Sequence, residues 1–158
     1  MNDLLVRMTA THTGMDALPL RLGAGVIFTA HGAQKLFGWF GGYGLEATGA
    51  WMTSIGLGPG LLMAALAGSV EFVGGLLLLA GLLVRPAALM LVVTMLVAIF
   101  AVHIDNGLFM SDNGYEFGLA LLVVSFGLVV RGGGSLSADR LITDRLVSVG
   151  TAGGRILT

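Results

Sequence analysis

The sequence predicts an all-α integral membrane protein, a bundle of four transmembrane helices with both termini in the cytoplasm. Of its 158 residues, 56% are hydrophobic and only 11% are charged, whereas about a quarter of the residues of a soluble globular domain are charged. The mean hydropathy is +0.93, and most of the apolar residues fall in four long runs. So few charges cannot cover a surface in water, and we therefore expect lipid to cover much of it.

The four apolar runs predict the transmembrane helices in order along the chain. An α-helix needs roughly 20 residues to cross the hydrocarbon core of a bilayer, and the third and fourth runs are at or just below the short end of the usual range. The predicted spans cover about residues 18–36, 61–84, 87–103 and 115–130. Together they form one bundle over residues 18–131.

The segments outside the spans differ in character. Residues 1–17 are polar and mixed, and they predict a cytoplasmic arm. The outer loop, 37–60, is rich in glycine and in aromatic residues that favour the membrane interface, and 45–55 predicts a short helix there. Three consecutive glycines open the segment 132–158 and predict a flexible break. The leucine spacing that follows predicts a cytoplasmic amphipathic tail helix, with a loosely ordered tail as the alternative.

The orientation follows from the distribution of lysine and arginine. Arg7 precedes the first span, Arg85 lies between the second and third, and four arginines follow the fourth. The other two loops carry acidic residues, and Lys35 at the end of the first span is the only cation near them. Because cytoplasmic segments of membrane proteins carry an excess of lysine and arginine, we expect both termini and the second loop in the cytoplasm.

Composition excludes several kinds of chemistry. The chain has no cysteine, which excludes thiol–disulfide exchange and iron–sulfur ligation by its own residues. The net charge of -1 provides no field that would attract nucleic acid, so no nucleic-acid partner is expected. The 26 glycines favour close helix packing, either within one bundle or in a homo-oligomer. No phosphate-binding or dinucleotide-binding glycine motif is present.

The few ionisable residues of the spans are the candidate functional residues. A charge in the bilayer costs about 2.5–3.5 kcal/mol and usually faces the bundle interior or a cavity. Five such residues are expected near the outer side of the bundle, where they would form a ligand or proton pocket. They are His31, Lys35, Glu71, His103 and Glu116.

Glu71 lies near the middle of the second span and needs a partner. An isolated carboxylate there would take up a proton, unless a cation from the first span lies beside it. The stripe of the first span offers Lys35 and Arg21, with His31 at its flank, and an Arg21–Glu71 ion pair is one candidate arrangement. Snorkelling of the two cations to the headgroups is the alternative.

A metal site has little support in the sequence. The donors His31, His103, Glu71 and Glu116 come from different helices, and no local spacing brings them together. We therefore expect no metal. His103 and Glu116 have a simpler interpretation as caps at the membrane interface, since a carboxylate at a helix start is favoured by the helix dipole.

The ordered set of motifs resembles the DoxX family. The likeness covers about residues 18–142, most of the chain, and each motif is weak on its own. The motifs are Arg21-Leu22-Gly23, His31-Gly32, Lys35-Leu36-Phe37-Gly38, Leu45-Glu46, Glu71-Phe72-Val73-Gly74-Gly75, Gly81 with Arg85, His103 with Asn106-Gly107, Gly114-Tyr115-Glu116 and the Gly-Gly-Gly-Ser-Leu-Ser-Ala-Asp run at 132–139.

The resemblance implies a four-helix, multi-pass protein of the bacterial cytoplasmic (inner) membrane that takes part in redox physiology. Family members are associated with a membrane oxidoreductase complex and its soluble redox partners, and a related branch is part of a thiosulfate:quinone oxidoreductase. The family has no settled catalytic residues to carry over. Because this chain lacks cysteine, a direct thiol role does not fit it.

Three functions are therefore open. The first is a membrane subunit of a redox system, an oxidoreductase subunit and not a stand-alone enzyme, that binds a quinone-like or other small ligand in the outer pocket. The second is transport or efflux of a small molecule through the same polar groups. The third is a non-catalytic scaffold that docks a soluble partner at its cytoplasmic tail.

Overall fold

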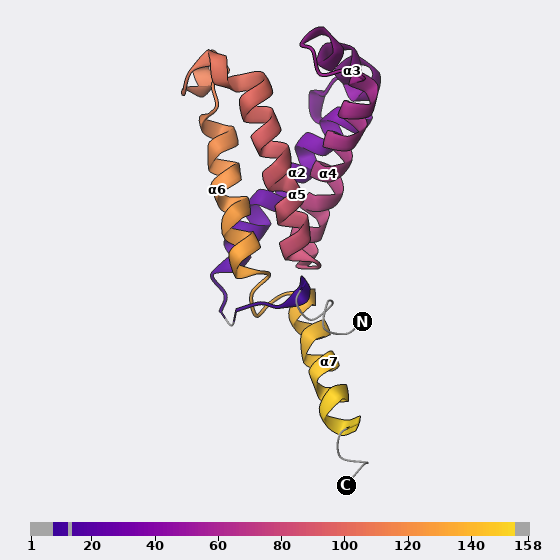
Figure 1. Cartoon of the computed structure of the whole chain (residues 1–158), viewed down its shortest axis with the longest axis vertical. Coiled ribbons are helices and arrows are strands. Elements are labelled where there is room, and N and C mark those ends of the chain that lie inside the picture. Colours follow the sequence, from indigo (N-terminus) through magenta and orange to yellow (C-terminus); the bar gives the residue numbers. More distant parts are fainter. Residues whose placement is uncertain (1–7, 13, 154–158) are drawn as a thin grey trace.

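The computed structural model describes residues 8–12 and 14–153 of the chain. Within this part the protein is all-helical, as predicted, and four helices lie alongside one another (Figure 1). They are α2 (Ala17–Phe37), α4 (Gly60–Ala80), α5 (Val84–Ala98) and α6 (Glu116–Arg131). Arg7, Arg155 and the end of the predicted tail lie outside the described residues.

Further helical elements lie at the two ends of these four helices. At one end lie the short helix η1 (Trp39–Gly41), helix α3 (Gly44–Ser54) and the 104–115 loop with its two single turns, η3 (Ile104–Asn106) and η4 (Met110–Asp112). We call this the loop end. A π-helical turn, η2 (Ile99–His103), extends α5 toward it. Helix α7 (Ala138–Gly153) points away from the opposite end (Figure 1).

The helix bounds agree with the predicted spans except at the second loop. Helix α4 ends at Ala80, not at residue 84, and α5 begins at Val84, not at residue 87. Gly81 ends α4 in the left-handed conformation, with φ +68°, which glycine adopts without steric cost. The turn therefore lies inside an apolar run, where hydropathy does not reveal it. Pro86 lies in the first turn of α5, where proline is tolerated.

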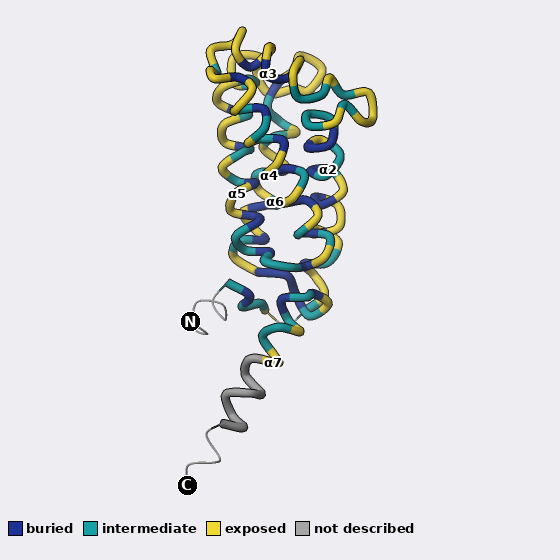
Figure 2. Tube along the Cα trace, turned by 90° about the vertical axis from the view of Figure 1, so that its right-hand side faces the viewer, coloured by how far each residue is buried: buried dark blue, intermediate teal, exposed yellow. Residues whose placement is uncertain are grey.

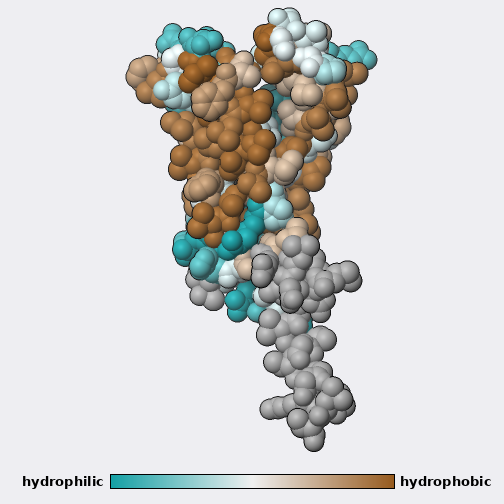
Figure 3. Space-filling model, viewed as in Figure 1, coloured by the Kyte–Doolittle hydropathy of each residue, from teal (hydrophilic) through white to brown (hydrophobic). Residues whose placement is uncertain are grey.

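On the face seen in Figure 3 the side of the bundle is mostly apolar, and the hydrophilic residues gather toward its two ends. Large hydrophobic residues are exposed along every long helix; Val26, Leu66, Val93 and Val123 are examples. Two helices of the described chain are long and apolar enough to cross a membrane, α4 and the continuous run Val84–Asn106. Helix α2 carries three ionisable residues, and α6 has only 16 residues. The crossing of the membrane by all four helices stays a prediction.

The buried core lies between the four helices (Figure 2). Phe28 of α2, Leu78 of α4, Leu91 of α5 and Leu128 of α6 are each 1% exposed or less. In a membrane, buried side chains of this size hold helices together through van der Waals packing, because lipid tails are as apolar as leucine. The core therefore holds the four helices in one unit at the end where α7 begins.

That end, which we call the base, consists of residues 9–12, 14–16, 81–85 and 131–139. The backbone N–H of His12 donates to the carbonyl of Arg131 (3.2 Å), and that of Ser135 donates to the carbonyl of Gly14 (2.9 Å). The described N-terminal residues and the start of the C-terminal segment thus lie at the same end of the bundle, as an even number of spans requires. The side of the membrane on which the base lies stays a prediction.

The segment 132–139 is packed into the base and is not a free linker. Asp139 is 1% exposed, and its carboxylate accepts the backbone N–H groups of Leu83 (2.7 Å) and Val84 (2.9 Å) at the start of α5. Burial raises the pKa of this carboxyl, while the two N–H donors act in the opposite direction. The expected flexible break is thus an ordered segment that satisfies the first N–H groups of α5, which would otherwise lack partners.

Candidate functional site

The central feature of the loop end is an ion pair between α2 and α4. The Lys35 ammonium donates to the Glu71 carboxylate across 2.6 Å. The Glu71 side chain is 4% exposed and that of Lys35 is 25% exposed, so the carboxylate lies inside the bundle and the ammonium reaches its surface. Lys35 thus satisfies the carboxylate that the sequence placed in the middle of a span.

Glycines bring the two helices close enough for this pair. A Cβ atom added at Gly32 of α2 would lie 2.3 Å from the backbone nitrogen of Phe72 in α4, and one added at Gly75 would lie 2.5 Å from the backbone nitrogen of Thr29. A Cβ at Gly68 would meet the Cβ of Lys35 at 3.3 Å. Small residues at such contacts let helix backbones approach in membranes, and here the approach sets the register that places Lys35 beside Glu71.

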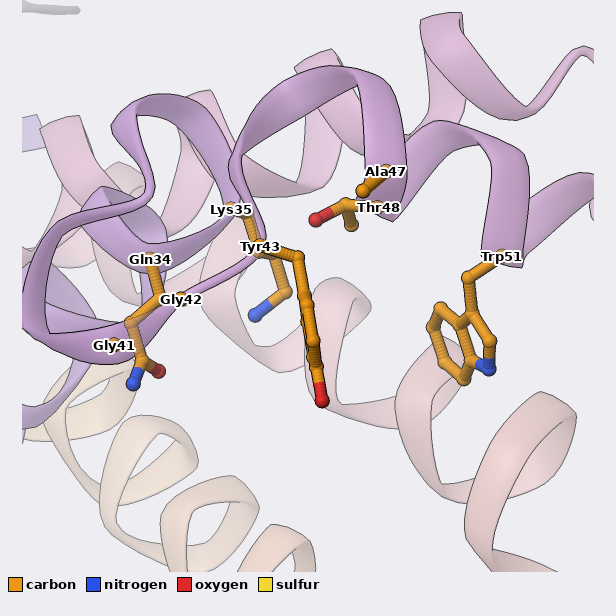
Figure 4. Close-up of a pocket in the computed structure, with 8 residues that line it drawn as sticks. All are labelled: Gln34, Lys35, Gly41, Gly42, Tyr43, Ala47, Thr48 and Trp51. Carbon is orange, nitrogen blue, oxygen red and sulfur yellow. The ribbon is translucent and has the colours of Figure 1, made fainter.

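A cavity of about 540 Å³ opens beside Lys35. Helix α2, the turn after it and helix α3 supply its walls, which comprise Gln34, Lys35, Gly41, Gly42, Tyr43, Ala47, Thr48 and Trp51. Figure 4 shows the Tyr43 and Trp51 rings standing along the same opening, with the Thr48 hydroxyl above them. Its size is typical of small-molecule pockets, which span about 300–1,000 Å³.

The cavity offers several free hydrogen-bonding groups. An ammonium has three N–H donors, and among the described residues the structure gives Lys35 one acceptor, Glu71. The Gln34 amide uses one N–H for the carbonyl of Phe40 (3.3 Å), which leaves its oxygen unused. The Thr48 hydroxyl likewise has no protein partner within the described chain. A ligand in this cavity would therefore meet donors at Lys35 and Thr48, and an acceptor at Gln34.

The other predicted pocket residues do not line this cavity. His31 is exposed, and its ring lies 6.0 Å from that of Phe117 at a tilt of 48°. His31 therefore faces α6 and not the cavity. His103 bonds through Nδ1 to the carbonyl of Asn113 at 2.8 Å. Glu116 accepts the backbone N–H of Met110 at 2.7 Å. The last two residues thus hold the 104–115 loop, and their interpretation as caps at the membrane interface stays a prediction.

Arg21 does not pair with Glu71 in the structure. It lies near the base, is 3% exposed, and donates to the carbonyls of Gly133 (3.2 Å) and Leu136 (2.8 Å). These acceptors belong to the ordered 132–139 segment, which sequence patterns presented as a linker. The described residues contain no group of three or more histidines or acidic residues placed to hold a metal.

Seven of the eight lining residues escaped the site prediction, and four of these seven have polar or aromatic side chains. Tyr43, Thr48 and Trp51 belong to the outer loop and α3, and Gln34 precedes Lys35 in α2. The loop was expected to lie at the membrane interface, where tryptophan and tyrosine are frequent for reasons unrelated to ligands. For two of them the sequence held a signal, because residues 48 and 51 are three positions apart and so share one face of a helix.

A comparison with protein-family models identifies the family. A family model described as DoxX matches residues 17–104, more than half of the chain, and this range holds the ion pair and every residue that lines the cavity. The chain belongs to the DoxX family. It is accordingly a membrane protein, and lipid contact explains the exposed apolar sides of its helices.

The curated relatives of this DoxX-family chain are bacterial. A Haemophilus influenzae protein described as an uncharacterized protein is 31% identical over 138 residues, which cover 86% of this chain and 89% of the relative. A Bacillus subtilis protein named "Putative oxidoreductase CatD" is 32% identical over 128 residues, which cover 81% of this chain and 87% of the relative. No solved structure matches this chain.

Proposed function

We propose that this protein is the membrane subunit of a redox system and that its loop-end cavity binds the ring of a quinone-like ligand. The observation that carries the proposal is the position of Lys35, whose ammonium is held by buried Glu71 at 2.6 Å and lines a cavity of about 540 Å³. The name of the Bacillus subtilis relative supports an oxidoreductase role.

The cavity suits a flat ring that carries carbonyl oxygens. Tyr43 and Trp51 present aromatic faces along the opening, and aromatic pairs stack in offset or edge-to-face arrangements that contribute about 0.5–1.5 kcal/mol each. A free N–H of Lys35 would donate to one carbonyl of the ring. Thr48 would donate to a second oxygen or accept from a hydroxyl.

Lys35 and Glu71 would also handle protons. A quinone accepts two electrons together with two protons. This chain has no cysteine and so no thiol to supply the electrons, which in this proposal come from a partner protein. The Lys35–Glu71 hydrogen bond connects the cavity to a carboxylate that is 4% exposed. Glu71 is therefore placed to hold one of the two protons away from water and to exchange it through Lys35, and the second proton would come from water at the mouth of the cavity.

The proposal includes a placement in the membrane. The loop end, with Trp39, Phe40 and Tyr43 exposed, would lie at the outer interface of the bacterial cytoplasmic membrane. The base carries Arg85 and Arg131 and would lie in the cytoplasm, in keeping with the usual excess of cationic residues there. A soluble redox partner would then approach from the side of the base or of the loop end, and cross-linking from each end distinguishes the two.

Fluorescence quenching tests ligand binding, since the chain has two tryptophans and only one lines the cavity. In detergent, W39F retains Trp51 alone and W51F retains Trp39 alone. We expect 2-methyl-1,4-naphthoquinone to quench W39F saturably and W51F only by collision, in linear proportion to concentration. Linear quenching of both variants would refute a binding site in the cavity.

Lysine acylation provides an independent test. Lys35 is the only lysine in the sequence, so an amine-reactive reagent labels only Lys35 and the chain's amino terminus. The same quinone should slow labelling of Lys35 and leave labelling of the amino terminus unchanged, as read by mass spectrometry. Equal rates at Lys35 with and without the quinone would contradict binding beside the ammonium.

A further inference from the structure

The charge of the cavity depends on a residue that does not line it. Lys35 is the only charged residue among those that form the walls. A lone ammonium in a partly enclosed site would attract anions, because the interaction of two charges strengthens as the effective dielectric constant falls. On the evidence of its walls alone, the cavity would be an anion site.

The Glu71 carboxylate, which does not line the cavity, neutralises the charge of Lys35. Its carboxylate is 2.6 Å from the Lys35 nitrogen and almost fully buried. The pair has no net charge whether the shared proton lies on the nitrogen or on the oxygen. Glu46 precedes the lining residue Ala47 in α3 and does not itself line the cavity; it is exposed, so water and salt screen its charge.

We infer that Glu71, acting through Lys35, makes the cavity select uncharged flat rings and reject anions of the same size. This inference rests on the proposed function, that the cavity binds a ring. Lys35 retains its hydrogen-bond donors, so an uncharged carbonyl is still recognised. An anion would give up its hydration without meeting a net positive charge, and burial of an uncompensated charge is costly.

The same neutral pair also bears on where a charged co-substrate would bind. An anionic co-substrate, such as a small oxyanion, would have to bind elsewhere in the assembled system, because the Lys35 ammonium is already neutralised. Among the described residues the arginines lie at the base or in α7; Arg21 and Arg85 donate to backbone carbonyls there, and Arg131 pairs with Asp16. The cavity would therefore handle the uncharged reactant alone.

Two probes with the same ring system, one neutral and one anionic, test the inference. They are 2-methyl-1,4-naphthoquinone, which is neutral, and 1,4-naphthoquinone-2-sulfonate, which is an anion. Both are titrated against the W39F protein in detergent, with Trp51 fluorescence as the readout. We expect the neutral ring to bind at least about tenfold more tightly than the sulfonate.

The variant E71Q removes the negative charge and keeps the shape of the side chain. The sulfonate should then gain at least about tenfold in affinity relative to the neutral ring. E46Q removes an exposed carboxylate of α3 that does not line the cavity and should change the ratio by less than about twofold. E71D keeps the carboxylate and should retain the preference for the neutral ring, which a purely structural role of Glu71 would not predict.

The outcomes separate this inference from the proposed function. If neither ring quenches Trp51 saturably, the proposed function fails and the inference fails with it. If the neutral ring binds and the sulfonate binds equally well, only the inference fails. An unchanged ratio in folded E71Q also overturns it. Where E71Q does not purify as folded protein, the wild-type ratio and the E71D ratio decide.

Discussion

The glycine contact between α2 and α4 yields a quantitative prediction. In Gly32→Ala the new Cβ atom would lie 2.3 Å from the backbone nitrogen of Phe72 and 2.7 Å from the carbonyl oxygen of Gly68. Both neighbours are backbone atoms, which cannot rotate away as a side chain can. Because ordinary contact begins at 3.4 Å, the two helices must separate by about 1 Å.

This separation should destabilise the protein measurably. Overpacking of a close interface costs about 1–3 kcal/mol, which for a chain of this length corresponds to a fall in Tm of roughly 3–10 °C. The assay is thermal unfolding in detergent, followed by intrinsic fluorescence. The displaced α2 also carries Lys35 away from Glu71, so the ion pair should lengthen in the same variant.

Gly23→Ala is the matched control. Gly23 lies in the same helix, and a Cβ atom added there meets nothing within 4 Å. Replacing a helix-interior glycine by alanine in open space should stabilise the helix by about 0.5–1 kcal/mol. If Gly32→Ala and Gly23→Ala unfold at the same temperature, the α2–α4 backbone contact is not what positions the ion pair.

Two further predictions concern the base. Asp139→Asn replaces a carboxylate that accepts two backbone N–H groups by an amide with one acceptor oxygen, so it should lower the free energy of unfolding by about 1–3 kcal/mol. Asp144→Asn, at an exposed ion pair, is the control and should cost less than about 1 kcal/mol. Equal losses in thermal unfolding would contradict the capping role of Asp139. The Asp16–Arg131 hydrogen bond lowers the pKa of the Asp16 carboxyl below 3.8, so the pair contributes stability above about pH 4, and this contribution is lost as the pH falls through the lowered pKa. The difference in Tm between the wild-type protein and Asp16→Asn should therefore be constant from pH 7 to about pH 4 and shrink at lower pH, and a difference that grows on acidification would refute the assignment.

The sequence predicted the individual helices well because hydropathy and charge are local properties. The runs around 18–36 and 115–130 became α2 and α6 within one residue at each end. The second loop was predicted too far along the chain, because its turn lies among leucines and hydropathy does not mark it. Leu83 has a left-handed backbone, with φ +48°, and Asp139 binds that turn from 56 residues further along the chain.

The candidate site was predicted only in part. Lys35 and Glu71 could be named because an ionisable residue in a span must face a partner or a cavity. Helix periodicity offered Arg21, His31 and Lys35 as candidates for that partner, and the predicted ion pair joined Arg21 to Glu71, which the structure does not show. The choice of Lys35 depends on where α2 meets α4, and therefore on which glycines allow the backbones to touch.

By itself, the sequence determined that the chain is helical and apolar, that its charges gather at the ends of the helices, and that Glu71 needs a cation. Only the tertiary structure decided that Lys35 is that cation, that Tyr43, Thr48 and Trp51 wall a cavity beside it, and that the 132–139 segment belongs to the base. The physical reason is that burial cost acts on each residue separately, whereas partner choice depends on the register between helices, which close backbone contact sets.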